Sequence, residues 1–206
     1  MFSIKQKQKT FNDLFDVSAH ESLFFDIKKI QNQIDIISDS PIVAITSLED
    51  DLLSVLLGKA FSDVYSKNCY RTLLIDANVC KPQLRDFLIS QGMLNNSFNT
   101  TLLEPFNAYN NLDIFFFNEE QYPSHFFKSN RIKQFLDSLQ KKYDRVVLLI
   151  PNVLEHEETL FVSSLTRVLL IISIQDSTSK ELVFRALSFC KENFFSQSKI
   201  ILLKNK

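Results

Sequence analysis

The sequence predicts an α/β protein in which a parallel, doubly wound sheet lies between two layers of helices. Six short segments are rich in apolar residues, and most of them are nearly continuous aliphatic runs, as in strands that are buried on both faces of a parallel sheet. Segments with apolar residues at helical spacing separate these runs, so strands and helices alternate along the chain. With 206 residues, 45% of them hydrophobic, the chain is long enough for one domain with a full core.

The predicted strands are short aliphatic runs bounded by polar or turn-forming residues. The fourth is the clearest, because RVVLLI has no polar residue after its arginine and is closed by Pro151. The second, RTLLID, ends on Asp76. In chain order, the runs lie at residues 41–46, 71–76, 111–117, 145–150, 167–173 and 200–203.

The predicted helices carry apolar residues three and four positions apart, which places these residues on one side of each helix. Pro82 stands near the start of the third helix, where a proline is favourable because its missing N–H would have no partner in the helix. In chain order, the helices are expected at residues 21–36, 52–64, 81–91, 131–142, 155–165 and 179–193. Residues 1–20 are polar and poorly periodic, so we expect a flexible N-terminal segment followed by a single domain over residues 21–206.

Composition argues against several classes of function. A net charge of -1 provides no basic surface for nucleic acid. No apolar run reaches the roughly 18 residues that span a bilayer, so direct insertion into a membrane is not expected. The three cysteines are widely spaced and include no CxxC pair, which disfavours metal and disulfide sites. These features favour a cytoplasmic protein, held at the inner face of the membrane, if at all, through a partner.

The turn after the first predicted strand is the most informative segment. Ligands of parallel sheets bind at the carboxyl ends of the strands, which is where this turn lies. It consists of Ser47, Leu48, Glu49, Asp50 and Asp51. A phosphate-binding loop needs glycines, so that backbone N–H groups can converge on the anion, and a lysine, and this turn has neither. Its three carboxylates would repel phosphate and suit the positive end of the following helix instead.

Four segments, in this order, carry a resemblance to a known family. They are LLIDANVCKP at 73–82, NLDI at 111–114, PSHFFKSNR at 123–131 and KYDRVVLLIP at 142–151. Together they resemble the cytoplasmic domain of bacterial tyrosine kinases of polysaccharide export, which are ParA/MinD-like P-loop ATPases. The resemblance spans roughly residues 21–206 and implies the three-layer sandwich of P-loop NTPases.

The chain departs from this family at the positions that carry its chemistry. The glycine-rich loop is degenerate, and Lys59 lies further along the helix than the family's phosphate-binding lysine. The aspartate that ends the fourth strand and helps to hold Mg²⁺ is replaced by Leu149. The two arginines of the oligomerisation motif fall on Phe24 and Ile27, and the C-terminal tyrosine cluster is missing, since the last tyrosine is Tyr143. The resemblance therefore implies a pseudoenzyme without catalytic residues, metal or cofactor.

Asp76 and Lys81 are the residual candidates for nucleotide binding. Asp76 corresponds to the one acidic motif residue that the chain retains, and the resemblance implies a carboxylate that binds Mg²⁺ or orients water. The alternative is a strand-end acid that caps the next turn through its backbone. Lys81 either contacts an anion or pairs with Asp76 at the surface.

These features lead to two hypotheses about function. The first is a catalytically inactive scaffold or regulatory subunit of a membrane-associated machine for polysaccharide synthesis, export or secretion, whose partner is a related ATPase or the membrane-associated complex itself. Its candidate interface residues are Phe24, Ile27, Phe126 and Phe127, which could equally belong to the core. The second is a divergent nucleotide-binding switch or ATPase of the ParA/MinD type that binds ATP and Mg²⁺.

Overall fold

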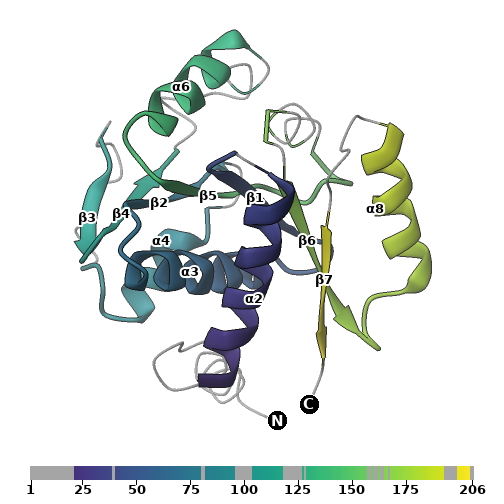
Figure 1. Ribbon diagram of the computed structural model, residues 1–206. Coiled ribbons are helices and arrows are strands. Elements are labelled where there is room, and N and C mark those ends of the chain that lie inside the picture. The colour runs from purple at the N-terminus through teal and green to yellow at the C-terminus, as the bar shows by residue number, and fades with distance from the viewer. Residues whose placement is uncertain are drawn as a thin grey trace.

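The fold is built on a seven-stranded sheet with helices on both faces (Figure 1). The computed structural model describes residues 21–38, 40–79, 82–95, 104–117, 127, 129–156, 159, 162, 165–166, 168–192 and 199–204. The strands are β1 Ile42–Ser47, β2 Thr72–Asp76, β3 Phe106–Tyr109, β4 Leu112–Phe116, β5 Arg145–Leu149, β6 Val168–Gln175 and β7 Lys199–Lys204. They lie in the order β3-β4-β2-β5-β1-β6-β7, and all pairs are parallel except β3 with β4. The predicted α/β fold is thus confirmed.

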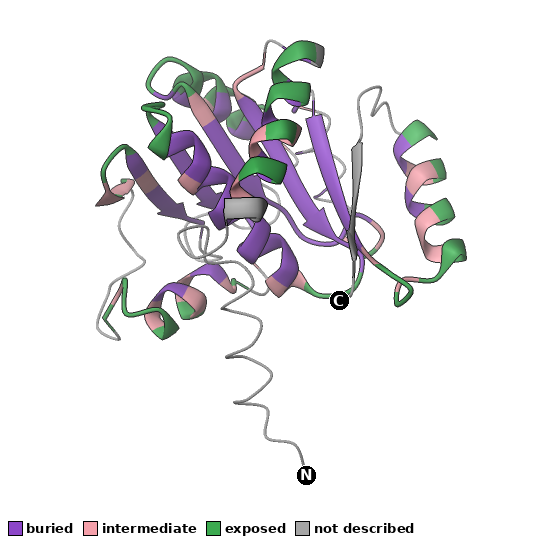
Figure 2. Cartoon of the chain, turned by 60° about the horizontal axis from the view of Figure 1, so that its bottom comes forward, coloured by how far each residue is buried: buried purple, intermediate pink, exposed green. Residues whose placement is uncertain are grey.

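Two helical layers cover the sheet. The helices are α2 Glu21–Ile37, α3 Asp51–Lys67, α4 Leu84–Ser90, α6 Asn130–Gln140 and α8 Lys180–Glu192. One core cluster joins α2, α3 and α4 to one face of the sheet, and a second cluster joins α6 and α8 to the other face. Strand side chains alternate between the two clusters, which explains why successive positions in the middle of the central strands are aliphatic. Figure 2 shows these strands buried while the helices expose their outer sides.

Two differences from the sequence-based expectation concern local elements. Strand β3 was not predicted; it forms a hairpin with β4 through Asn110, whose φ of 47° is tolerated by asparagine. Helix α4 begins at Leu84, later than the predicted 81–91, and Gly92 follows its end with a φ of 70°. Most of the helix expected at 155–165 and all of residues 1–20 lie outside the described residues.

Helix α3 lies against the centre of the sheet at a point of close approach. Thirteen of its residues are buried, and it packs on β1, β2 and β5. A Cβ added to Gly58 would come within 2.3 Å of Leu149 Cδ2, so only glycine leaves room for the leucine at the end of β5. Helix α2 packs on α3 in turn, and Gln31 Nε2 donates a hydrogen bond to the Phe61 carbonyl at 2.9 Å.

Among the helices that the structure describes, none combines the length and the apolar character needed to cross a bilayer.

Candidate functional site

The candidate site lies at the carboxyl ends of β1, β2 and β5, which are neighbours in the sheet. Strand β1 ends at Ser47 and helix α3 begins at Asp51, so only Leu48, Glu49 and Asp50 connect them. A phosphate-binding loop of the Gly-rich type has a motif of about eight residues that wraps around the anion. This motif runs into the first turn of the following helix, and here the residues at that place, 48–54, contain neither glycine nor lysine.

Backbone N–H groups in and next to this connection donate to nearby side chains. Glu49 N and Asp50 N donate to Ser47 Oγ at 3.4 and 3.3 Å. Leu52 N donates to Asp50 Oδ1 at 2.9 Å, which makes Asp50 the N-cap of α3. These N–H groups at the start of a helix are the kind that would bind a phosphate. A serine hydroxyl and an aspartate carboxylate occupy them instead.

Leu48 and its neighbours close the site from the side of β5. The Leu48 side chain is only 3% exposed and belongs to the second core cluster. Leu48 N donates to the Ile172 carbonyl on β6 at 3.1 Å, and Asn152 Nδ2 donates to the Leu48 carbonyl at 3.2 Å. Thr46 Oγ1 donates to the Pro151 carbonyl at 2.9 Å. Sequence reasoning missed Asn152, since nothing in its local pattern marks a contact with a turn about 100 residues earlier.

Asp76, at the end of β2, is a buried carboxylate that holds the chain after it. It is 1% exposed, and its two oxygens accept hydrogen bonds from Asn78 N at 3.0 Å and Leu84 N at 3.1 Å. Burial raises the pKa of Asp76 to about 7, an effect that backbone hydrogen bonds oppose and the nearby Asp51 charge reinforces. The bond to Asn78 N is the contact that the capping interpretation of Asp76 requires.

Asp51 stands beside Asp76 at the start of α3. Asn78 Nδ2 donates to Asp51 Oδ2 at 3.2 Å, so the asparagine side chain links the end of β2 to α3. Lys81, the other residual candidate, lies outside the described residues. Within the described part of the chain, no group of three or more His, Cys, Asp or Glu side chains is arranged to hold a metal ion.

Leu149 occupies the position where the resemblance places the metal-binding aspartate. It pairs in register with Asp76 on the neighbouring strand and is 2% exposed. Its side chain packs toward Gly58 within the first core cluster. An apolar contact with a helix therefore stands where a carboxylate would be needed.

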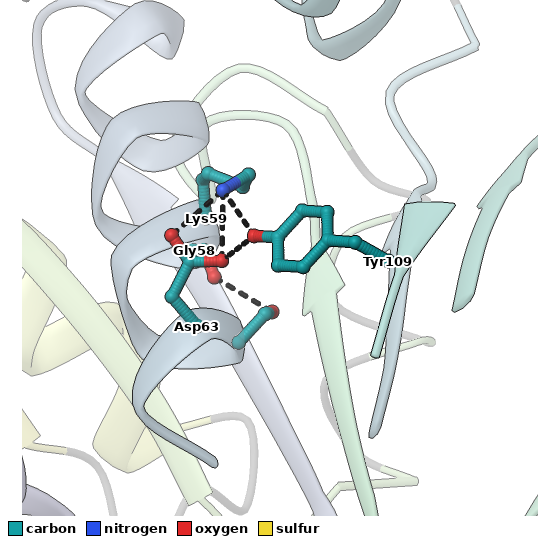
Figure 3. Close-up of polar contacts among 5 residues, drawn as sticks. Gly58, Lys59, Asp63 and Tyr109 are labelled. Carbon is teal, nitrogen blue, oxygen red and sulfur yellow. Dashed lines mark hydrogen bonds and ion pairs between the residues drawn. The ribbon is translucent and has the colours of Figure 1, made fainter. Parts of the chain in front are cut away.

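Lys59 is directed away from the candidate site. Its Nζ contacts both carboxylate oxygens of Asp63 at 2.7 Å and Tyr109 Oη at 2.6 Å (Figure 3). Tyr109 Oη also hydrogen-bonds to Asp63, and burial together with the Asp63 charge raises the pKa of the phenol. The lysine is 7% exposed and is thereby held in a structural network between α3 and β3.

The structure corrects the candidate interface. Ile27 and Phe127 are 1% and 2% exposed, so the interface interpretation is wrong for both and they belong to the core. Ile27 packs in the cluster between α2 and α3, and the Phe127 ring lies 5.1 Å from that of Phe117. Phe24 is partly buried against the same cluster as Ile27, and Phe126 lies outside the described residues.

Comparison with known proteins identifies the fold. No protein-family model matches the chain, and no curated protein does. Solved structures do match. The kinase domain of the Escherichia coli tyrosine kinase ETK superposes with a TM-score of 0.74 at 13% identity, over 95% of this chain and 81% of that one. The chain has the fold of bacterial tyrosine kinase domains. Its expected resemblance to them is therefore confirmed at the level of the fold.

Two further structures support this assignment. The VpsO kinase domain gives a TM-score of 0.71 at 16% identity, over 97% of this chain and 98% of that one. The cell-division protein MinD of Aquifex aeolicus gives 0.60 at 15% identity, over 81% of this chain and 70% of that one. The fold of these kinase domains and of MinD is thus shared over most of the chain.

Proposed function

We propose that this chain is a non-catalytic protein with the tyrosine kinase and MinD-like fold, acting as a scaffold or regulatory subunit without a bound nucleotide. The observation that carries the proposal is the connection between β1 and α3. It consists of Leu48, Glu49 and Asp50; the N–H groups of Glu49 and Asp50 donate to Ser47 Oγ, and Asp50 itself accepts from Leu52 N at the start of α3. Phosphate would have to displace both side chains and approach an exposed pair of carboxylates, Glu49 and Asp50, of like charge.

The contacts of Leu48 and Leu149 add to this argument. Leu48 is buried, so opening the connection would expose a leucine side chain, at a cost of about 1.5–3 kcal/mol. Leu149 supplies no metal ligand beside Asp76, which leaves one carboxylate where the family has two acidic positions. A protein of this design works through its surface, and its role depends on what that surface binds.

The partner that we propose is another protein. The tyrosine kinase fold favours either an active ATPase of the same fold or a membrane-associated complex for polysaccharide synthesis, export or secretion. In either case the chain would contribute a stable, nucleotide-independent body to the assembly.

Nucleotide binding is the test. We expect thermal unfolding of the purified chain to be unchanged by millimolar Mg·ATP or Mg·ADP, and titration calorimetry to detect no binding. A ligand present at 100 times its Kd would stabilise the chain by about 2.7 kcal/mol, which raises Tm by several degrees at this size.

A second candidate function, a divergent nucleotide-dependent switch, is favoured by one observation. Asp76 is retained at the end of β2, with Asp51 nearby and linked to the same segment through Asn78. If this function is correct, Mg·ATP will raise Tm, and the effect will disappear in Asp76→Asn and persist in Glu49→Gln, the matched control in the same loop. That result would overturn the non-catalytic proposal.

A further inference from the structure

Helix α8 lies at the periphery of the molecule and exposes one side along its length (Figure 1). The exposed residues of the helix are Lys180, Glu181, Phe184, Arg185, Ser188, Lys191 and Glu192. Because they recur at intervals of three or four positions, they form one continuous stripe. Phe184 is the large apolar side chain of this stripe, and it is 72% exposed. A phenylalanine ring loses contact with water favourably, so the stripe is a candidate contact surface.

An open groove lies beside the same stripe. It has a volume of about 390 Å³ and separates α8 from the turn that contains Leu154. Phe184 stands at its edge, and the other residues used below are Leu154, Glu181, Arg185, Phe189 and Glu192, which we call the α8 groove. A space of this size, with apolar side chains in its lining, can admit an aromatic ring.

The stripe has two flanks of opposite charge. At 3.6 residues per turn, neighbours in sequence lie 100° apart around the helix, which divides the charged residues into two sets. One flank consists of Lys180, Phe184 and Lys191, and the flank toward the groove consists of Glu181, Arg185 and Glu192. Glu155, exposed in the turn of Leu154, adds negative charge beside the groove. The Phe184 flank is therefore positive, and the groove flank, where glutamates outnumber the arginine, is negative.

The signs of the flanks favour one way of pairing two copies. In an antiparallel twofold pair of helices, each flank meets the same flank of the second copy, so like charges would meet. In a parallel twofold pair, each flank meets the opposite flank, as the e and g positions do in a parallel coiled coil. The parallel pair brings Lys180 level with Glu181 of the second copy. It also brings Lys191 level with Glu192, so all four contacts of this kind join opposite charges.

We propose that two copies of this chain associate through α8 as a parallel, twofold-symmetric pair, in which Phe184 of each copy enters the α8 groove of the other. The same contact is made twice, once in each direction, as in other isologous interfaces. Arg185 of one copy then lies beside the Phe184 ring of the other, where a guanidinium group can stack on the ring. Each copy uses both flanks of its α8, so association stops at the dimer. The inference is independent of the nucleotide proposal, since the interface does not include the β1–α3 connection.

The size of the surface sets the expected affinity. Helix α8 is about 20 Å long at 1.5 Å per residue, so the helix and the adjoining turn form a contact at the small end of specific interfaces. We therefore expect a Kd in the micromolar range.

Sedimentation velocity of the full chain over a range of concentrations tests the inference. We expect the wild-type mass to approach that of a dimer and to rise no further. Phe184→Ser should raise the Kd of the dimer at least about tenfold, as does the loss of a central apolar anchor. Met93→Ser is the matched control, because it removes a 46% exposed apolar side chain outside α8, and it should associate like wild type.

Charge reversal tests which flanks meet. Lys180→Glu/Lys191→Glu and Glu181→Lys/Glu192→Lys should each weaken self-association, because each makes both flanks alike in sign. A 1:1 mixture of these two double variants should form mixed dimers, since a negative flank of one then meets a positive flank of the other in both contacts. If like flanks met instead, neither double variant would lose affinity, and that result would overturn the parallel pair.

Two further outcomes would overturn the inference. The first is a wild-type chain that stays monomeric at hundreds of micromolar, which would leave the groove to a different protein. The second is an association that Phe184→Ser does not weaken or that continues beyond the dimer, because another surface would then hold the copies together.

Discussion

At the scale of single residues, the candidate site is shaped by pairs of residues that fit one another. Leu149 fills space above α3 that exists only because position 58 is glycine. Leu48 is buried where a phosphate loop would be open, and Asn152 fixes its carbonyl. Each contact joins residues from different segments, so reversing one of them alone would leave its partner badly packed or unpaired.

Gly58 and Leu149 are expected to be energetically coupled. Gly58→Ala should destabilise the chain by about 1–3 kcal/mol in urea unfolding, because the new Cβ overlaps Leu149 Cδ2. In a Leu149→Ala background the same change should be nearly neutral or stabilising, since alanine is favoured over glycine in a helix by about 1 kcal/mol. Gly92→Ala is the control: its cost comes from a φ of +70° with no atom within 4 Å, so Leu149→Ala should not relieve it. Equal costs for Gly58→Ala in both backgrounds would contradict this account.

Asp76 is expected to make stability fall as pH rises. Its pKa is raised from 3.8 to about 7 in the folded chain, so between these values the folded state binds more protons than the unfolded state. The contribution of this group is fully present below pH 3.8 and is lost as pH rises through about 7, a change of up to about 4 kcal/mol. Wild type should therefore lose stability relative to Asp76→Asn as pH rises from 4.5 to 8, which the difference between their unfolding free energies measures. A pH-independent difference would show that Asp76 titrates normally.

At the scale of elements, the polar network of Lys59, Asp63 and Tyr109 holds the antiparallel edge strand β3 on α3 (Figure 3). Strand β3 pairs with β4 alone in the described sheet, and its residues are partly exposed. The network therefore adds a fixed contact at the end of the strand. Since the lysine is buried, its charge depends on the aspartate for compensation.

Removing one charge of this network should lower the unfolding free energy more than removing both charges together. Asp63→Leu leaves Lys59 buried without its counter-charge and should lower the unfolding free energy by about 3–5 kcal/mol. Lys59→Met/Asp63→Leu should cost clearly less, because no unpaired charge remains. Hydrogen exchange of β3 should increase in the single variant. Tyr109→Phe, which keeps the ring and the ion pair, serves as the milder comparison, and an additive double variant would contradict the coupling.

At the scale of the whole molecule, the order of the strands decides which segments surround the candidate site and cover it. Strand β1 lies between β5 and β6, so the turn at Leu48 meets Asn152 after β5 and Ile172 on β6. The helical layers bury both faces of the sheet, and the outer sides of α2 and α8 remain exposed. The absence of a shift in Tm with Mg·ATP would indicate a fold whose stability does not depend on nucleotide.

The sequence by itself determined the elements whose signal is local. Runs of mainly apolar residues identified the six parallel strands, because a strand covered on both faces needs apolar residues at successive positions. The lack of glycine and lysine after the first strand identified the altered loop before any contact was known. The location of Asp76 at a strand end made capping of the next turn one of two interpretations, and its bond to Asn78 N is of the kind that this interpretation expects.

The tertiary structure decided what depends on distant pairs. Strand β3 carries little aliphatic signal and exists through its hairpin with β4 and its contact with α3. Apolar side chains such as Ile27 and Phe127 occur in interfaces and in cores alike. Only the packing of Ile27 against α3 and of Phe127 against Phe117 places them in the core. The proximity of Gly58 to Leu149 follows from how a helix lies on a sheet. Such contacts depend on the register of strands far apart in the chain, which no local pattern of residues contains.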